Sequence, residues 1–184
     1  MGVATAFMPG RTPQEAVGAF LDPLREALKV LDAVTKISVA HKGGFRKGVE
    51  YAWVLNRGSG ARLGNAGTFV AAMSFEVIEC DPDKNEFGHP YRVSTGSYHY
   101  KLRGLNGQDL WRMHWHPKGN SPVTYAHLHL PPNFKRHLAC ERTTFEKAIL
   151  WCVEYGAPLT CTAEEAADRL LLLEATHRLH RSWV

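Results

Sequence analysis

The sequence contains no long hydrophobic run and few cysteines. No window of its 184 residues approaches the ~18 consecutive apolar residues that a membrane-spanning helix requires, so we expect no membrane segment. Residues 1–14 also lack the long apolar core of a secretion signal, and we therefore expect a cytoplasmic protein. The four cysteines follow no spacing typical of a disulfide framework or a zinc ribbon, which favours reduced thiols.

Internal repeats, low-complexity tracts and a phosphate-binding loop are absent as well. The glycine-rich stretch 56–67 lacks the lysine and hydroxyl pattern of such a loop, which indicates a flexible connection rather than a nucleotide site. Apolar residues make up 45% of the chain and charged residues 22%, and the formal net charge is +4. This length and composition are typical of one globular domain over residues 1–184.

Three capping boxes mark the starts of helices. In each box a threonine precedes a glutamate by three residues, and the two side chains accept hydrogen bonds from backbone N–H groups that have no partner within the helix. The boxes predict an N-terminal helical segment over 12–34, which Asp22-Pro23 should break into two helices or kink, and two C-terminal helices within 143–183. The boxes are Thr12–Glu15, Thr143–Glu146 and Thr162–Glu165.

The region between these helices, residues 36–130, is typical of consecutive antiparallel strands. Segments rich in β-branched and aromatic residues alternate with turn sequences such as Asp81–Asn85. Helix, then strands, then two helices indicates an α+β fold: a curved antiparallel β-sheet of five to seven strands with helices packed on one face. The expected strands are 36–40, 49–55, 68–80, 91–95, 97–103, 110–116 and 124–130.

Three of these strands separate apolar side chains from basic ones, because successive residues of a strand point to opposite faces of the sheet. In 110–116 the tryptophans and the methionine alternate with an arginine and two histidines, and 97–103 and 124–130 show the same separation. We therefore predict that one face packs against helices. The other face should present His99, Lys101, Arg103, Arg112, His114, His116, His127 and His129, with Glu76 as a further candidate from an earlier strand.

Histidine and positive charge are concentrated in one part of the chain. Six of the ten histidines lie in residues 97–142, together with seven Lys or Arg and two Asp or Glu residues. This segment therefore carries a formal charge of +5, whereas the whole chain carries +4. The basic character of the protein is local.

Three interpretations of the histidine face remain open. The face is a solvated polar surface, or it is a metal site, or it binds nucleic acid, either as a catalytic site that cleaves it or as a non-catalytic module that binds nucleic acid or protein. A metal site would use His114, His116, His127 and His129 as ligands of a divalent transition metal, because His-x-His places two imidazoles on one face of a strand. Arg112 and Lys101 count against it, since their charges repel a cation.

The third interpretation makes the protein a metal-independent endoribonuclease without a cofactor. Histidine supplies an acid and a base near neutral pH, and arginine stabilises charge on phosphate. The predicted catalytic residues are His114, His116, His127, His129 and Arg112, with the acid and the base on different strands. The predicted substrate-binding residues are His99, Lys101, Arg103, Tyr125, Lys135 and Arg136, where Tyr125 would stack on a base and 131–137 would form a basic rim.

Several short motifs resemble the small TumE-type toxins of bacterial toxin–antitoxin systems. The similarity covers roughly residues 70–155 and rests on Tyr98–Tyr100, Leu110–His116, His127–His129 and Arg142–Glu146. It implies a growth-inhibiting toxin that acts on RNA and is held by an antitoxin, and it assigns no catalytic residues. Independently, the run Leu170–Leu173 is apolar on all sides of the last helix, which predicts burial or contact with a partner and leaves a homo-oligomer open.

Overall fold

The computed structural model describes residues 10–41, 43–84, 88–119, 121–180 and 182–183. The described chain has the α+β fold that the sequence predicts: one antiparallel sheet with helices packed on it. The elements are α1 (Pro13–Leu28), β1 (Ile37–Val39), β2 (Glu50–Leu55), β3 (Ala61–Arg62), β4 (Thr68–Glu79), β5 (Tyr91–Arg103), β6 (Asp109–Trp115), β7 (His127–His129), β8 (Leu138–Ala139), α2 (Phe145–Glu154), α3 (Ala163–His180) and β9 (Ser182–Trp183).

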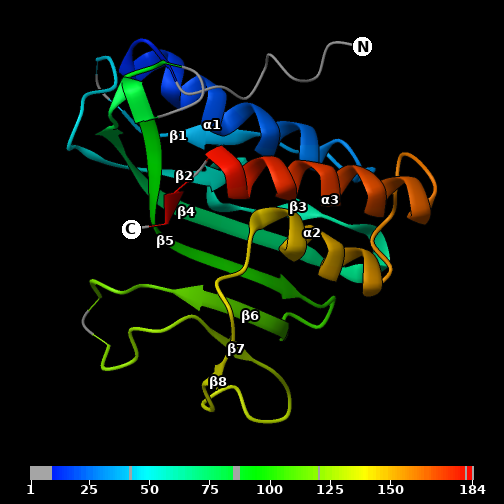
Figure 1. Ribbon diagram of the computed structural model, residues 1–184. Helices are drawn as coiled ribbons and strands as arrows, with labels where there is room; N and C mark the ends of the chain where they lie inside the picture. The colour runs from blue at the N-terminus through cyan, green and yellow to red at the C-terminus, as the bar shows by residue number, and fades with distance from the viewer. Residues whose placement is uncertain (1–9, 42, 85–87, 120, 181, 184) are drawn as a thin grey trace.

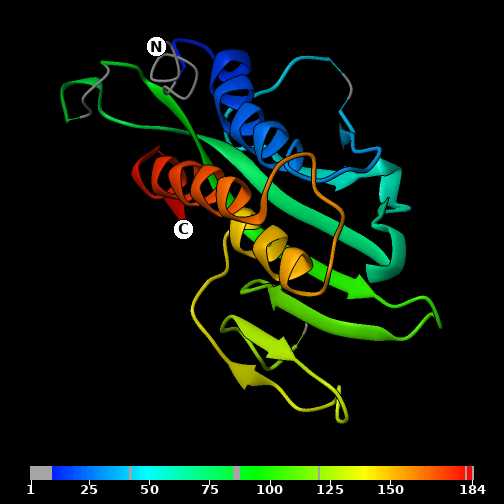
Figure 2. The ribbon, with the colours of Figure 1, turned by 90° about the vertical axis from the view of Figure 1, so that its right-hand side faces the viewer.

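The main path of the sheet runs β1-β2-β4-β5-β6-β7-β8, so that most neighbours in space are neighbours in sequence. β3 pairs with the start of β4, and β9 pairs in parallel with β5. The helices α1, α2 and α3 lie together on one face of the sheet, and β6, β7 and β8 extend beyond them (Figures 1 and 2). The described sheet has nine strands: the seven predicted segments form six of them, because 91–95 and 97–103 are both part of β5, and β3, β8 and β9 were not predicted.

The face that the helices cover holds the large apolar side chains. Tyr98 and Tyr100 of β5 are buried there, as are Trp111 and Trp115 of β6. Phe145 of α2 packs against this face, with its ring centroid 5.7 Å from that of Tyr100. The alternation predicted for these two strands is therefore confirmed, and it leaves their basic side chains on the opposite face.

One extra residue interrupts the pairing of β4 with β5. Ser74 is opposite Ser97 but Phe75 is opposite Thr95, so Gly96 forms a β-bulge between them. The sequence-predicted strands 91–95 and 97–103 are for this reason one continuous strand, β5. The bulge allows Thr95 and Tyr98 to face the same buried side although they are three residues apart.

The N-terminal segment differs from its prediction. Residues 13–28 form a single helix that contains Pro23, and the helix ends well before residue 34. Phe20, Leu24 and Ala27 are buried on either side of the proline, so tertiary packing holds the helix together where the lost backbone hydrogen bond alone would favour a break. Thr12 caps the helix as predicted, because its hydroxyl accepts from the N–H of Glu15.

The second capping box begins one residue later than predicted. Thr144, and not Thr143, is the N-cap of α2, and its hydroxyl accepts from the N–H of Lys147. Thr143 is instead bound to the sheet, since its N–H donates to the hydroxyl of Tyr98 at 2.7 Å. This contact across 45 residues places the start of α2 beside β5.

Candidate functional site

The histidines of β5, β6 and β7 lie side by side because these strands pair in register. His114 of β6 is directly opposite His99 of β5 and His127 of β7. Directly opposed residues of antiparallel strands project from the same face and come close to one another. Two residues along, the same register aligns Lys101, Arg112 and His129.

The four histidines that the sequence predicts as catalytic come together as expected. The ring centroid of His114 lies 5.4 Å from that of His127 and 5.1 Å from that of His129. His116 is 5.4 Å from His127, and His99 is 4.3 Å from His114. The predicted gathering of His114, His116, His127 and His129 on one surface is confirmed in its geometry, whereas their chemical role stays a prediction.

A sixth histidine, His137, belongs to the same group and was not among the predicted site residues. Its ring centroid lies 4.7 Å from those of both His127 and His129. The chain turns after β7 and returns as β8, whose Leu138 pairs with Leu128, and this return brings His137 beside His129. In the sequence, this return is indicated by the turn residues Pro131-Pro132-Asn133 and by the short apolar pair after His137. We refer to His99, His114, His116, His127, His129 and His137 as the histidine cluster.

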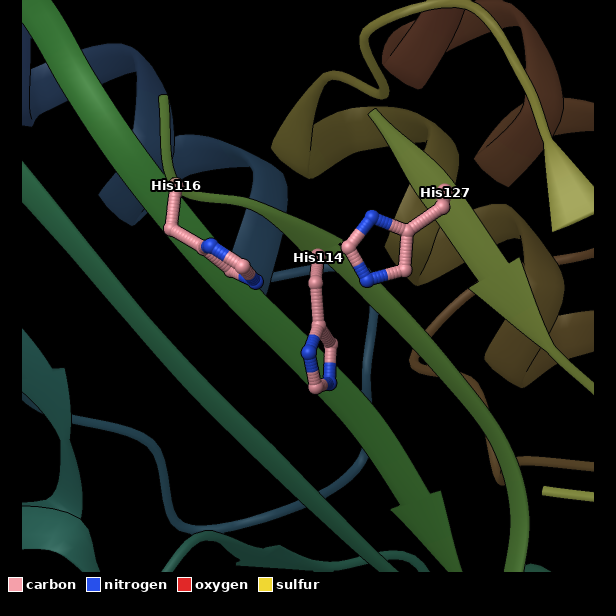
Figure 3. A group of neighbouring side chains, drawn as sticks. All are labelled: His114, His116 and His127. Carbon is pink, nitrogen blue, oxygen red and sulfur yellow. The ribbon is translucent and has the colours of Figure 1, made fainter. Parts of the chain in front are cut away.

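The histidine cluster contains two sets of three imidazoles that are close enough to share an ion. In the inner group, one ring nitrogen from each of His114, His116 and His127 lies within 4.8 Å of the other two. Figure 3 shows these three side chains converging from β6, from the residue that follows it, and from β7. The outer group consists of His127, His129 and His137 and meets the same distance. The two groups have His127 in common.

The histidines of β7 are buried, contrary to a solvated polar face. His127 is 1% exposed and His129 is 6% exposed. The Nδ1 atom of His127 lies 2.9 Å from the carbonyl oxygen of Tyr125. Because a carbonyl can only accept a hydrogen bond, Nδ1 carries the proton and Nε2 keeps its lone pair.

Two nitrogen atoms of the histidine cluster are buried without a hydrogen-bond partner in the described part of the chain. They are Nε2 of His114 and Nδ1 of His129. A buried polar atom that lacks a partner costs about 1–3 kcal/mol, so such atoms are uncommon in folded proteins and need an explanation. Bonding to a metal ion is one way in which a neutral imidazole satisfies such a lone pair.

The surroundings lower the pKa of four members of the histidine cluster and so favour their neutral form. Burial lowers the pKa of His114 to about 3, and the neighbouring histidines add to this shift. Loss of hydration also lowers the pKa of His127 and of His129. The pKa of His99 falls to about 4, first through burial and then through the positive charges of Lys101 and Arg112. Neutral imidazole is the form that ligates metals, whereas a general acid must be protonated.

Arg112 is committed to contacts within the protein. Its Nε donates to Asp109, whose side chain is nearly buried, and its guanidinium lies 5.0 Å from the ring centroid of Phe134. Arg103 also pairs with Asp109, at 3.5 Å. The acid therefore offsets part of the positive charge beside the histidine cluster. Together with Lys101, Pro131 and Pro132, these side chains line a hollow in the surface.

The remaining predicted substrate-binding residues lie around the rim. Tyr125 is 49% exposed and precedes β7, with its ring centroid 6.1 Å from that of His127. Lys135 and Arg136 are exposed in the turn that leads to His137. Glu76 lines a separate hollow with His116 and Lys118, and it belongs to neither three-histidine group.

A third hollow opens directly beside the inner group. Its floor is made by small residues of β2, β4 and β5, and its wall by His99, His114 and His116. The hydroxyl groups of Ser74 and Ser97 lie there, 2.7 Å apart and hydrogen-bonded to each other. The inner group is thus accessible from the face of the sheet that the helices leave uncovered.

Comparison with known proteins gives no relative: no protein-family model, no curated protein and no solved structure matches this chain. The resemblance to TumE-type toxins accordingly stays a prediction from short motifs. None of the described helices combines the length and the apolar character needed to span a bilayer.

Proposed function

We propose that this protein binds one divalent transition-metal ion through His114, His116 and His127. The observation that carries the proposal is the convergence of three ring nitrogens, each within 4.8 Å of the others, on the face of the sheet that the helices leave uncovered. Three histidines with a remaining open position are typical of zinc sites that take part in reactions. The hollow beside His114 and His116 supplies access to that position.

The chemistry of the donors supports the proposal. A tetrahedral ion with Zn–N bonds of ~2.1 Å requires nitrogen–nitrogen distances of about 3.4 Å, so the three rings need to close by roughly 1 Å. Burial favours neutral His114 and His127, and Nε2 of His114 has no hydrogen-bond partner among the described residues. Imidazole nitrogens suit zinc, copper, nickel and iron more than calcium or magnesium.

The charge argument against a metal is weaker in the structure than in the sequence. Arg112 was expected to repel a cation, but Asp109 is hydrogen-bonded to it on the same strand. Because Asp109 is shared with Arg103, it offsets one of the two guanidinium charges, and the repulsion of an ion is reduced by that amount.

Metal analysis tests this proposal directly. Purified protein should hold close to one zinc, nickel or copper ion per chain after dialysis, and EDTA should remove it. His114→Gln and His116→Gln should each weaken zinc binding in calorimetry by about 100-fold or more, because loss of a ligand exceeds the 10–100-fold effect of losing a supporting group. His41→Gln, an exposed histidine far along the chain, is the matched control. Absence of bound metal, or equal affinity in all three variants, would contradict the proposal.

We propose RNA as the substrate class of this site as a second candidate function. It is favoured by the basic side chains that flank the histidine cluster: Lys101, Arg103 and Arg112 line one hollow, and Lys135 and Arg136 are exposed beside His137. Phosphate contacts of this kind supply most of the affinity for nucleic acid. A bound metal ion would supply Lewis-acid stabilisation of a phosphodiester, whereas the metal-free acid–base mechanism needs a protonated histidine that burial disfavours.

An RNA cleavage assay separates these mechanisms. Total RNA should be cleaved by zinc-loaded protein, and EDTA should abolish the cleavage. Cleavage that persists in EDTA with a bell-shaped pH dependence would restore the metal-free mechanism with His114, His116, His127 or His129 as acid and base. Intact RNA under every condition would remove the nuclease and, with it, the implied antitoxin partner.

A further inference from the structure

We infer that the outer group, His127, His129 and His137, is a second position for the same ion, and that the ion occupies either the inner or the outer position but not both. The inference rests on the proposed metal binding and extends it to a path by which the ion reaches the inner group. Two observations that are independent of the inner group carry it: the geometry of the outer group and the state of His129.

The outer group satisfies the geometric requirement with different residues. One ring nitrogen from each of its three histidines lies within 4.8 Å of the others, and the ring centroid of His137 is 4.7 Å from both partners. His129 is 94% buried, and its Nδ1 atom has no hydrogen-bond partner in the described chain. A buried lone pair beside two further imidazoles indicates a ligand that completes it.

His127 prevents both positions from filling at once. Its Nδ1–H is held by the carbonyl of Tyr125, so only Nε2 has a lone pair for a metal. One nitrogen lone pair forms one bond to one ion. An ion in the outer position therefore has to leave before another can use His127 in the inner position, and the expected capacity is one ion per chain.

The two positions differ in their access to solvent. His137 is exposed in the turn before β8, a two-residue strand that pairs with β7 at the end of the sheet. His114 and His116 are partly buried on β6 and just after it. An ion that approaches along the β8 edge of the sheet thus meets His137 first. It can then exchange His129 and His137 for His114 and His116 while it stays bonded to His127.

Stopped-flow mixing with Co²⁺, whose visible absorption reports its ligands, tests this sequence. His137→Gln should slow uptake by about tenfold or more and change the equilibrium affinity much less, since the inner group is intact. The double variant His114→Gln/His116→Gln should still bind one Co²⁺ per chain, more weakly and with an altered spectrum. His41→Gln, which changes an exposed histidine outside the histidine cluster, should keep the rate and the stoichiometry of the wild type.

The outcomes distinguish this inference from the proposed function. Two Co²⁺ ions per wild-type chain, or unchanged uptake in His137→Gln, would overturn the shared position while leaving the inner site intact. Loss of all binding in the double variant would overturn the outer position alone. Binding that depends on His137 but not on His114 or His116 would instead overturn the inner site. Circular dichroism of each variant establishes that the fold is retained.

Discussion

Asp109 and Arg112 lie three residues apart on β6 and form a charge-assisted hydrogen bond of 2.5 Å next to the histidine cluster. The side chain of Asp109 is 7% exposed, so this carboxylate sets the local charge from within the protein. It therefore offsets part of the positive charge beside the metal position proposed above.

Asp109→Asn should lower the affinity of this region for cations and raise its affinity for anions. Without the carboxylate, the charge of Arg112 is no longer offset, so zinc affinity should fall and RNA affinity should rise. One additional phosphate contact would steepen the plot of log affinity against log salt by about 0.7–0.9. Asp168→Asn makes the same change in net charge on the exposed surface of α3 and should alter neither quantity. Identical behaviour of the two variants would show that Asp109 has no local role.

The metal-free protein should lose stability as the pH falls. The pKa of His114 is about 3 in the folded state against 6.5 as its ordinary value, so the unfolded chain takes up the proton first. The stabilising contribution is present above pH ~6.5 and is lost as the pH falls toward the folded-state pKa, amounting to about 2 kcal/mol between pH 7 and pH 5. Urea unfolding in EDTA measures it. His114→Gln should show a correspondingly smaller drop, and an equal drop would refute the assignment.

Tyr98→Phe should destabilise the protein by about 1–3 kcal/mol, because the N–H of Thr143 would lose its acceptor in a partly buried position. The ring itself would stay, so the packing against Tyr100 at 4.8 Å should be retained. Chemical denaturation gives the change in unfolding free energy. Tyr155→Phe, which alters an exposed tyrosine at the end of α2, should have no measurable effect.

The cysteines should differ sharply in reactivity. Cys152 is completely buried in α2, and burial raises the pKa of its thiol well above the ordinary range. A reagent therefore cannot reach the sulfur, and the reactive thiolate form is scarce. Cys140 is exposed just after β8. Iodoacetamide followed by peptide mass spectrometry should label Cys140 in the native protein and Cys152 only after unfolding. Early labelling of Cys152 would show that α2 opens readily.

The strands that carry most of the histidine cluster could be predicted because their pattern is local. In β5 and β6, aromatic and basic side chains alternate with a period of two, and this alternation fixes the two faces before any partner is known. The same reasoning placed His127 and His129 on the correct side of β7. It did not predict their burial, since that depends on the turn that passes beside them and leads to His137.

The errors have a common physical origin in contacts between distant residues. Pro23 lies inside a helix because residues before and after it are buried in the core. β8 forms because its backbone hydrogen-bonds to the free edge of β7. Neither a two-residue strand nor a proline within a helix has a reliable local signal. His137 was missed for the same reason: nothing in the sequence fixes where the chain returns after the turn at Pro131-Pro132.

Because of the β-bulge at Gly96, the effect of deleting one residue from β5 should depend on where the residue lies. Removal of Gly96 would leave Ser97 opposite Ser74 and Thr95 opposite Phe75 in regular pairing, so every side chain would keep its face. Removal of one residue between Tyr98 and Leu102 would instead move the side chains on one side of the deletion to the opposite face of the sheet. Basic side chains would then point into the core, and aromatic side chains would point away from it. Deletion of Gly96 should therefore leave the strand pairing intact, whereas deletion of one residue between Tyr98 and Leu102 should disrupt it.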